Sequence, residues 1–114
     1  MINKDRLTSL FVELVSIDNP SRHEREMCDR LKKELDELNI SYEEDNAGEL
    51  IDGNCGNLYA YVDGDLDAKP IILSAHMDSV DPAVGKKAII LTDLLHLQVI
   101  QYLALTTYQV SLLS

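Results

Sequence analysis

The sequence predicts an α/β fold of which only the first part is present: two helices followed by strands. Three observations lead to this prediction. Two stripes of apolar residues at helical spacing occupy the first third of the chain, shorter strand-like runs follow them, and the last of these runs is fully apolar. A chain of 114 residues is long enough for one small domain but too short for two ordinary ones.

The first helix is expected over Lys4 to Ile17. Its apolar residues fall on one face: Leu7, Leu10, Phe11, Leu14 and Val15. The run Asp18-Asn19-Pro20-Ser21 should end it, because proline disfavours helical backbone in the residue before it and has no amide hydrogen to donate.

The second helix is expected to begin at Ser21 and to run to about Asn39. Ser21 and Glu24 have the spacing of a capping box, in which each side chain satisfies a free backbone amide of the first turn. An apolar stripe then continues along the helix through Met27, Leu31, Leu35 and Leu38.

Three strands are expected after the helices. Ile40 to Asp45 alternates apolar and polar residues and should form an edge strand that turns Glu43 and Glu44 outward. The remaining segments are a loop over Asn46 to Asn57, a strand over Leu58 to Val62, a turn over Asp63 to Lys69, and a strand over Ile71 to Ala75. The last strand has no polar face, so we expect it to be a buried central strand.

The composition excludes several kinds of partner. Asp and Glu number 20 against 10 Lys and Arg, so the net charge is −10 and the pI is about 4.5. Such a protein repels phosphate backbones and anionic lipid, so we expect neither nucleic acid nor a membrane as partner. Two cysteines cannot form a disulfide framework and no signal segment opens the chain, which favours the reducing cytoplasm.

Charge is distributed unevenly along the chain. Every charged residue except Asp93 lies between Lys4 and Lys87, so Leu94 to Ser114 carries none. This tail is long enough to span a bilayer, and a tail-anchored small protein is therefore one alternative. Its glutamines, histidine, tyrosines, threonines and serines make insertion costly, and aggregation of an uncharged, β-prone segment is the favoured outcome.

The segment that carries chemistry is Ser74-Ala75-His76-Met77-Asp78-Ser79-Val80. His76 and Asp78 are two residues apart just after an apolar run, so an extended backbone would turn both side chains to one face. A histidine that binds a metal usually gives its other ring N–H to a carboxylate, which fixes its tautomer. The alternative is an ordinary pair of polar residues that caps a turn.

This segment resembles the M20 family of zinc metallopeptidases, most closely its tripeptide aminopeptidase (peptidase T-like) branch. The resemblance covers residues 1 to about 93 and includes the strand entry Gly56-Asn57-Leu58. It implies that His76 is a ligand of one of two zinc ions, that Asp78 is the catalytic-site aspartate, and that the fold is part of an α/β/α catalytic domain. The family's later G-A-D-D motif, glutamate pair and remaining ligands are not found in this sequence.

The tail can be read as a frameshift. Leu103-Ala104-Leu105-Thr106-Thr107-Tyr108-Gln109-Val110 can be encoded so that the displaced frame spells G-A-D-D-V-S-G, and the preceding residues permit G-D-T-V-L. Chance is the rival explanation, because the third codon base is free at many positions. We therefore predict that residues 1–93 are the N-terminal portion of an M20-type catalytic domain and that residues 94–114 are an out-of-frame tail without its own fold.

The other candidate residues are expected to have no catalytic role. His23 should be a solvated residue in the first turn of the second helix, and His96 in the tail should not be a ligand. Cys28 is expected in the core or at its boundary, and Cys55 is expected to be an exposed free thiol without an activating base. The run Glu43-Glu44-Asp45 could bind a cation, but a solvated strand edge is the favoured interpretation.

Two classes of function follow. The first is a metallopeptidase that hydrolyses the N-terminal peptide bond of short peptides with water activated by two zinc ions, this chain itself being inactive because the general-base glutamate is missing. The second is a non-catalytic binding or interaction protein built on the same half-domain.

Overall fold

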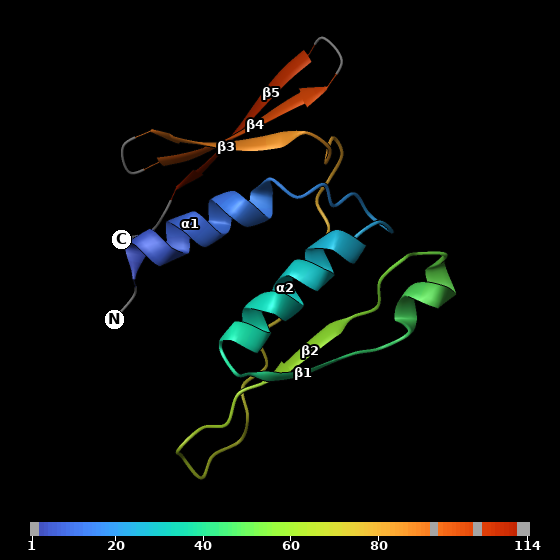
Figure 1. Ribbon diagram of the computed structural model, residues 1–114, viewed down its shortest axis with the longest axis vertical. Helices are drawn as coiled ribbons and strands as arrows, with labels where there is room; N and C mark the ends of the chain where they lie inside the picture. The colour runs from blue at the N-terminus through green and yellow to red at the C-terminus, as the bar shows by residue number, and fades with distance from the viewer. Residues whose placement is uncertain (1–2, 92–93, 102–103, 112–114) are drawn as a thin grey trace. The chain divides into compact units, whose positions relative to one another are not determined.

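The computed structural model describes residues 3–91, 94–101 and 104–111. The chain divides into two compact units (Figure 1). One unit is Ser21–Asp78, and the other combines Met1–Pro20 with Ser79–Ser114. The predicted class, helices followed by strands in a small α/β arrangement, is confirmed.

The unit Ser21–Asp78 contains a helix, a two-stranded sheet and a short 3-10 helix. Its elements are α2 (Arg25–Glu37), β1 (Ser41–Glu44), η1 (Ala47–Ile51) and β2 (Leu58–Tyr61). Strands β1 and β2 pair antiparallel, with Ser41 opposite Tyr61 and Glu44 opposite Leu58. Helix α2 packs beside β1, as Figure 1 shows.

Helix α2 begins three residues later than the capping box predicts, because its N-cap is Glu24 and not Ser21. Arg22 has φ 71°, a left-handed conformation that prevents Ser21 from leading directly into a helix. The carboxylate of Glu24 accepts a hydrogen bond from the backbone N–H of Arg22 at 2.7 Å, and the N-cap position is Glu24 itself. The capping-box prediction is therefore wrong. The Ser21 hydroxyl donates a hydrogen bond to the carboxylate of Asp78 instead.

The core of this unit is small and tightly fitted. Met27 and Cys28 on α2 are buried. The backbone of Cys55 passes so close to Gly48 that a β-carbon there would lie 2.1 Å from the Cys55 carbonyl oxygen. A β-carbon on Gly56 would likewise lie 1.9 Å from the carbonyl oxygen of Asp45. Glycine is required at both positions because the contacting atoms belong to the backbone.

The other unit combines a helix with a three-stranded antiparallel sheet in the order β3-β4-β5. Its elements are α1 (Lys4–Val15), β3 (Lys86–Leu91), β4 (Leu94–Gln101) and β5 (Ala104–Ser111). The side chain of Asn3 caps α1 by accepting a hydrogen bond from the N–H of Arg6 at 3.0 Å. Helix α1 packs beside β3 (Figure 1).

The turn that ends α1 is fastened to the segment before β3. Asn19 is buried, and its carbonyl accepts a hydrogen bond from the N–H of Ser79 at 3.0 Å. The ammonium of Lys86 donates to the Asn19 side chain and to the hydroxyl of Ser79. The carboxylate of Asp18 accepts from the N–H of Gly85 at 2.8 Å. Burial lowers the pKa of Lys86, and the neighbouring charge of Asp18 opposes that shift.

The prediction of a buried central strand over Ile71 to Ala75 is wrong. This segment lies outside any helix or strand, and the side chains of Ile71, Ile72 and Leu73 are 88%, 87% and 93% exposed. A strand becomes central only when neighbours pair with both of its edges. Among the described residues, β1 and β2 pair with each other and no strand pairs with this run.

The tail contains two of the strands described above, β4 and β5, whose register pairs Leu94 with Ser111 and Gln101 with Ala104. The expected boundary at Asp93 lies outside the described residues. That the tail is out of frame and has no fold of its own stays a prediction. In the part of the chain that the structure describes, no helix has the length and apolar character needed to cross a bilayer.

Candidate functional site

His76 and Asp78 lie at the end of the unit Ser21–Asp78, after the exposed apolar run. The Nδ1 atom of His76 is 3.3 Å from Oδ1 of Asp78. The imidazole is 93% exposed, whereas the Asp78 side chain is 30% exposed. The carboxylate thus faces one ring nitrogen, and the other, Nε2, lies on the opposite side of the ring.

The carboxylate of Asp78 is oriented by a hydrogen bond from Ser21. The Ser21 hydroxyl donates a hydrogen bond to Oδ2, which leaves Oδ1 for His76. This hydrogen bond, with the nearby imidazole, keeps the pKa of Asp78 below its usual value although partial burial opposes the shift. Asp78 is therefore an ionised, oriented acceptor at neutral pH, suited to fixing the tautomer of His76.

These residues could supply one ligand of a metal site. A neutral imidazole with a carboxylate on its Nδ1 side presents Nε2 as the donor atom, which is a common arrangement for zinc ligands. A catalytic zinc ion generally needs three protein ligands. Within the described ranges, the one group of three candidate ligand side chains does not include His76.

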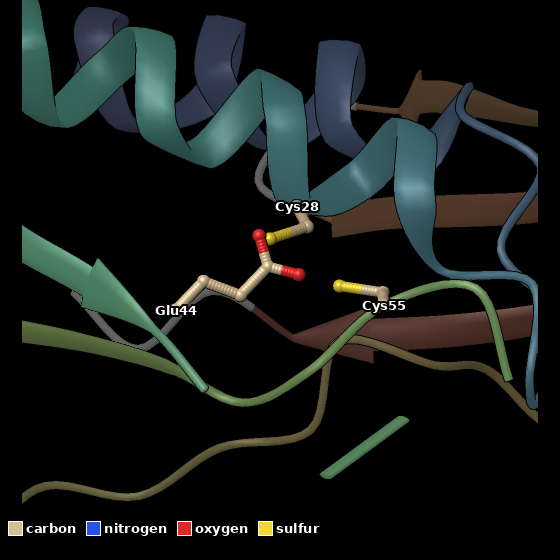
Figure 2. Close-up of side chains that lie close together, drawn as sticks. All are labelled: Cys28, Glu44 and Cys55. Carbon is tan, nitrogen blue, oxygen red and sulfur yellow. The ribbon is translucent and has the colours of Figure 1, made fainter. Parts of the chain in front are cut away.

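That group consists of Cys28, Glu44 and Cys55 (Figure 2). Cys28 comes from α2, Glu44 from the end of β1, and Cys55 from the loop between η1 and β2. One ligand atom of each, the two sulfurs and a carboxylate oxygen, lie within 4.8 Å of one another. Cys28 is fully buried, whereas Glu44 and Cys55 are half-buried. We call these residues the cysteine–glutamate cluster.

Glu44 in this cluster is fully occupied by hydrogen bonds. Arg25 donates from Nη1 to Oε1 and from Nη2 to Oε2, each at 2.8 Å. The ammonium of Lys32 donates to Oε2, and the N–H of Gly56 donates to Oε1 at 2.9 Å. Four donors match the roughly four lone-pair sites of a carboxylate. The bond to Arg25, followed by that to Lys32, holds the pKa of Glu44 well below its usual range although burial opposes the shift.

Two predictions about this region are wrong. Glu44 does not lie on a solvated strand edge: its side chain is 17% exposed and faces α2, while Glu43 points outward as expected. Cys55 is free but not exposed, because its loop is packed on Gly48. The sequence could not reveal either result, since Glu44 contacts residues 12 and 19 positions away and the burial of Cys55 depends on the close approach of its backbone to Gly48.

The remaining candidates occupy ordinary positions. Cys28 is buried, as expected. His23 is exposed, as expected, but it precedes α2 rather than lying in its first turn. His96 lies in β4 opposite Ile89 and Gln109, and its side chain is outside the described part of the structure.

Sequence reasoning missed Ser21 as a member of the site. Its contact with Asp78 joins residues 57 positions apart, and its neighbour Glu24 suggested a helix cap instead. Arg25 and Lys32, which hold Glu44, lie seven positions apart, a helical spacing that places both on one face of α2. That spacing was the available signal for a bound carboxylate.

Comparison with known proteins relates the chain to peptidases. No protein-family model matches it. It is 34% identical over 90 residues to the uncharacterised protein YqjE of Bacillus subtilis, a match that covers 79% of this chain and 24% of that protein.

Two solved structures are similar. A tripeptidase from Staphylococcus aureus superposes with a TM-score of 0.78 at 30% identity, over 85% of this chain and 26% of that one. Aminopeptidase PepT from Bacillus cereus gives a TM-score of 0.73 at 29% identity, over 84% of this chain and 26% of that one. The chain thus spans about a quarter of the length of these relatives, and its fold matches a fragment of a peptidase domain.

Proposed function

We propose that this chain corresponds to the N-terminal part of a tripeptide aminopeptidase of the M20 zinc metallopeptidase family. The observation that carries the proposal is the His76–Asp78 pair, in which an ionised carboxylate lies beside the Nδ1 atom of an exposed imidazole. The similarity to a tripeptidase and to an aminopeptidase supports it. In the intact enzyme the substrate would be a short peptide with a free N-terminus, cleaved at its first peptide bond.

His76 would be a zinc ligand through Nε2, and Asp78 the catalytic-site aspartate. Zinc, when bound, would supply a water activated for attack on a peptide carbonyl. Asp78, whose Oδ1 is 3.3 Å from Nδ1, would accept the Nδ1–H and so select the tautomer that offers Nε2 to a metal. Ser21 acts through Asp78, because its hydroxyl fixes the orientation of the carboxylate. Ser21 is therefore a positioning residue.

The 114-residue chain itself would be inactive. One imidazole and one carboxylate leave most of a zinc coordination shell to water. The motifs that hold the general-base glutamate and the bridging aspartate of the family are not found in this sequence. We place the intact enzyme in the cytoplasm, where the two free cysteines, Cys28 and Cys55, would stay reduced.

The zinc part of this proposal is tested by calorimetric titration of the chain. We expect weak binding, with no saturable site below micromolar concentration. A tight site that disappears in His76→Ala would show that further ligands complete the shell, and would contradict the proposal that this chain lacks them. His23→Ala is the matched control, because His23 is also an exposed histidine but lies 55 positions before Asp78 in the sequence.

The peptidase assignment is tested by sequencing the coding DNA around codon 93 and restoring one base there. Both proteins are then assayed with zinc and a tripeptide that has a free N-terminus. We expect the given chain to be inert and the restored protein to release the N-terminal residue, with activity lost in His76→Ala and kept in His23→Ala. Zinc-dependent hydrolysis by the given chain would refute its inactivity, and an inert, folded restored protein would refute the peptidase ancestry.

A further inference from the structure

The two cysteines of the cysteine–glutamate cluster come from distant parts of the unit Ser21–Asp78 and meet in its interior. Their sulfur atoms lie within 4.8 Å of each other, and both thiols are free (Figure 2). Cys28 lies in α2, and Cys55 lies in the loop that precedes β2. No role in the proposed peptidase site involves either residue, so their proximity needs a separate explanation.

Several contacts fix the position of the Cys55 loop relative to the start of α2. The N–H of Asn54 donates to the carbonyl of Arg22, and the side chain of Asn54 accepts from the N–H of Arg25, both at 3.0 Å. The carbonyl of Cys55 rests on Gly48, where no β-carbon would fit. Cys28 lies one turn into the same helix and is fully buried. The backbone segments that carry the two cysteines are therefore held in place by their surroundings.

A metal ion is not the partner that these thiols favour. The third member of the cluster, Glu44, already accepts four hydrogen bonds, which uses its acceptor capacity. Two of its partners, Arg25 and Lys32, are cations and would repel a metal ion. Without Glu44 only two sulfur ligands remain, fewer than a stable zinc site needs. The alternative chemistry of two adjacent thiols is their oxidation to a disulfide.

We propose that Cys28 and Cys55 are a redox pair, which closes into an intramolecular disulfide when the chain meets a low-molecular-weight disulfide such as oxidised glutathione. The bond would tie α2 to the η1–β2 loop. Its formation would require the two side chains to rotate until the sulfurs meet, starting from a separation of at most 4.8 Å.

The reaction proceeds by two thiol–disulfide exchanges. Cys55 reacts first because it is the less buried of the two residues: Cys28 is fully buried, whereas Cys55 is half-buried. The Cys55 thiolate attacks one sulfur of oxidised glutathione, the S–S bond of glutathione breaks, and one glutathione thiolate leaves and takes up a proton. The Cys28 thiolate then attacks the Cys55 sulfur and releases the second glutathione. The protein loses two electrons and two protons, and one disulfide is reduced to two thiols.

The surroundings make this pair slow to react. Burial, followed by the hydrogen bond with Cys28, raises the pKa of Cys55 to about 12. Of the charged groups that face the thiol, Arg25 opposes this shift and Glu44 adds to it. Because only the thiolate attacks, the first exchange should accelerate roughly tenfold for each unit of pH between 7 and 9. An ordinary exposed thiol would level off in that range.

The test uses the full chain and oxidised glutathione at several pH values, followed by mass spectrometry and peptide mapping. We expect a mass lower by about 2 Da, a Cys28–Cys55 linkage, a monomeric product, and reversal by dithiothreitol. Oxidation should raise the thermal midpoint by at least about 5 °C, because the bond closes a loop of more than twenty residues. Cys28→Ser should instead keep glutathione on Cys55, and Cys55→Ser should not react.

Other outcomes would overturn the proposal. A mixed disulfide that persists on Cys55 of the unaltered chain, or a disulfide between two chains, would show that the native thiols cannot meet. The same reaction in concentrated urea provides a check that does not depend on the variants folding. A linkage that forms in urea but not under native conditions would also contradict the proposal, as would a native chain that stays reduced at pH 9.

Discussion

Arg25 on α2 holds both carboxylate oxygens of Glu44 at the end of β1, with each nitrogen–oxygen distance 2.8 Å. This two-point contact joins the helix to the sheet in a unit whose apolar core is small. A guanidinium and a carboxylate match in shape, so the pair fixes orientation as well as distance. The unit therefore depends on a polar contact where a larger domain would use apolar packing.

Glu44→Gln should lower the free energy of unfolding by about 2 kcal/mol. The amide cannot accept from Arg25, Lys32 and Gly56 at once, so partly buried donors lose their partner. Denaturation with urea, followed by circular dichroism, measures the change. Glu43→Gln is the control: this side chain is exposed and accepts from the hydroxyl of Tyr61, so the change should stay within about 0.5 kcal/mol. Equal losses in the two variants would contradict this role of Glu44.

The same carboxylate predicts a dependence of stability on pH. The pKa of Glu44 in the folded chain lies well below 4.5, its ordinary value, so the unfolded state takes up a proton first as the pH falls. The stabilisation is complete above about pH 5 and is lost progressively below 4.5. When the free energy of unfolding is plotted against pH between 7 and 3, it should therefore decrease more steeply with falling pH for the unaltered chain than for Glu44→Gln. Parallel curves would show that Glu44 is not the group that titrates.

Gly56→Ala should destabilise the chain by about 2 kcal/mol or prevent folding. Its new β-carbon would lie 1.9 Å from the carbonyl oxygen of Asp45, so the backbone must move. Gly64→Ala is the matched control, because a β-carbon there meets nothing within 4 Å. Thermal unfolding of both variants tests the difference, and a tolerated alanine at position 56 would argue against this close packing of the loop.

Leu73→Asn should leave the stability of this chain unchanged to within about 0.5 kcal/mol. The side chain is 93% exposed, so its replacement removes no buried contact. Met27→Ala, which truncates a buried side chain, should instead cost about 2 kcal/mol or more. Urea denaturation of the two variants separates the cases. A large loss in Leu73→Asn would mean that residues 71–75 are buried, as the sequence pattern predicts.

The parts of the fold that local patterns determine were predictable. Helix α1, strand β1 and strand β2 occupy the expected segments, because helical stripes and strand alternation are properties of neighbouring residues. Residues 71–75 do not form the expected buried strand. An apolar run shows only that a segment could be buried, whereas its actual burial requires neighbouring strands that pair with it.

The site was predictable to the same extent. His76 and Asp78 are two positions apart, and the structure brings them together as the spacing indicates. Their assigned roles rest on the resemblance and stay predictions. Ser21 and the cysteine–glutamate cluster involve contacts across many residues, and the spacing of Arg25 and Lys32 suggests a bound carboxylate without identifying Glu44 as its source.

The exposed run Ile71-Ile72-Leu73 also bears on the lifetime of the chain in a cell. Chaperones and processive proteases recognise unfolded substrates by accessible apolar stretches in irregular backbone, and this run presents one in the native state. Cellular surveillance would therefore treat the folded chain as a damaged one. Its abundance would be set by the rate of degradation at this segment more than by the stability of α2 and its sheet.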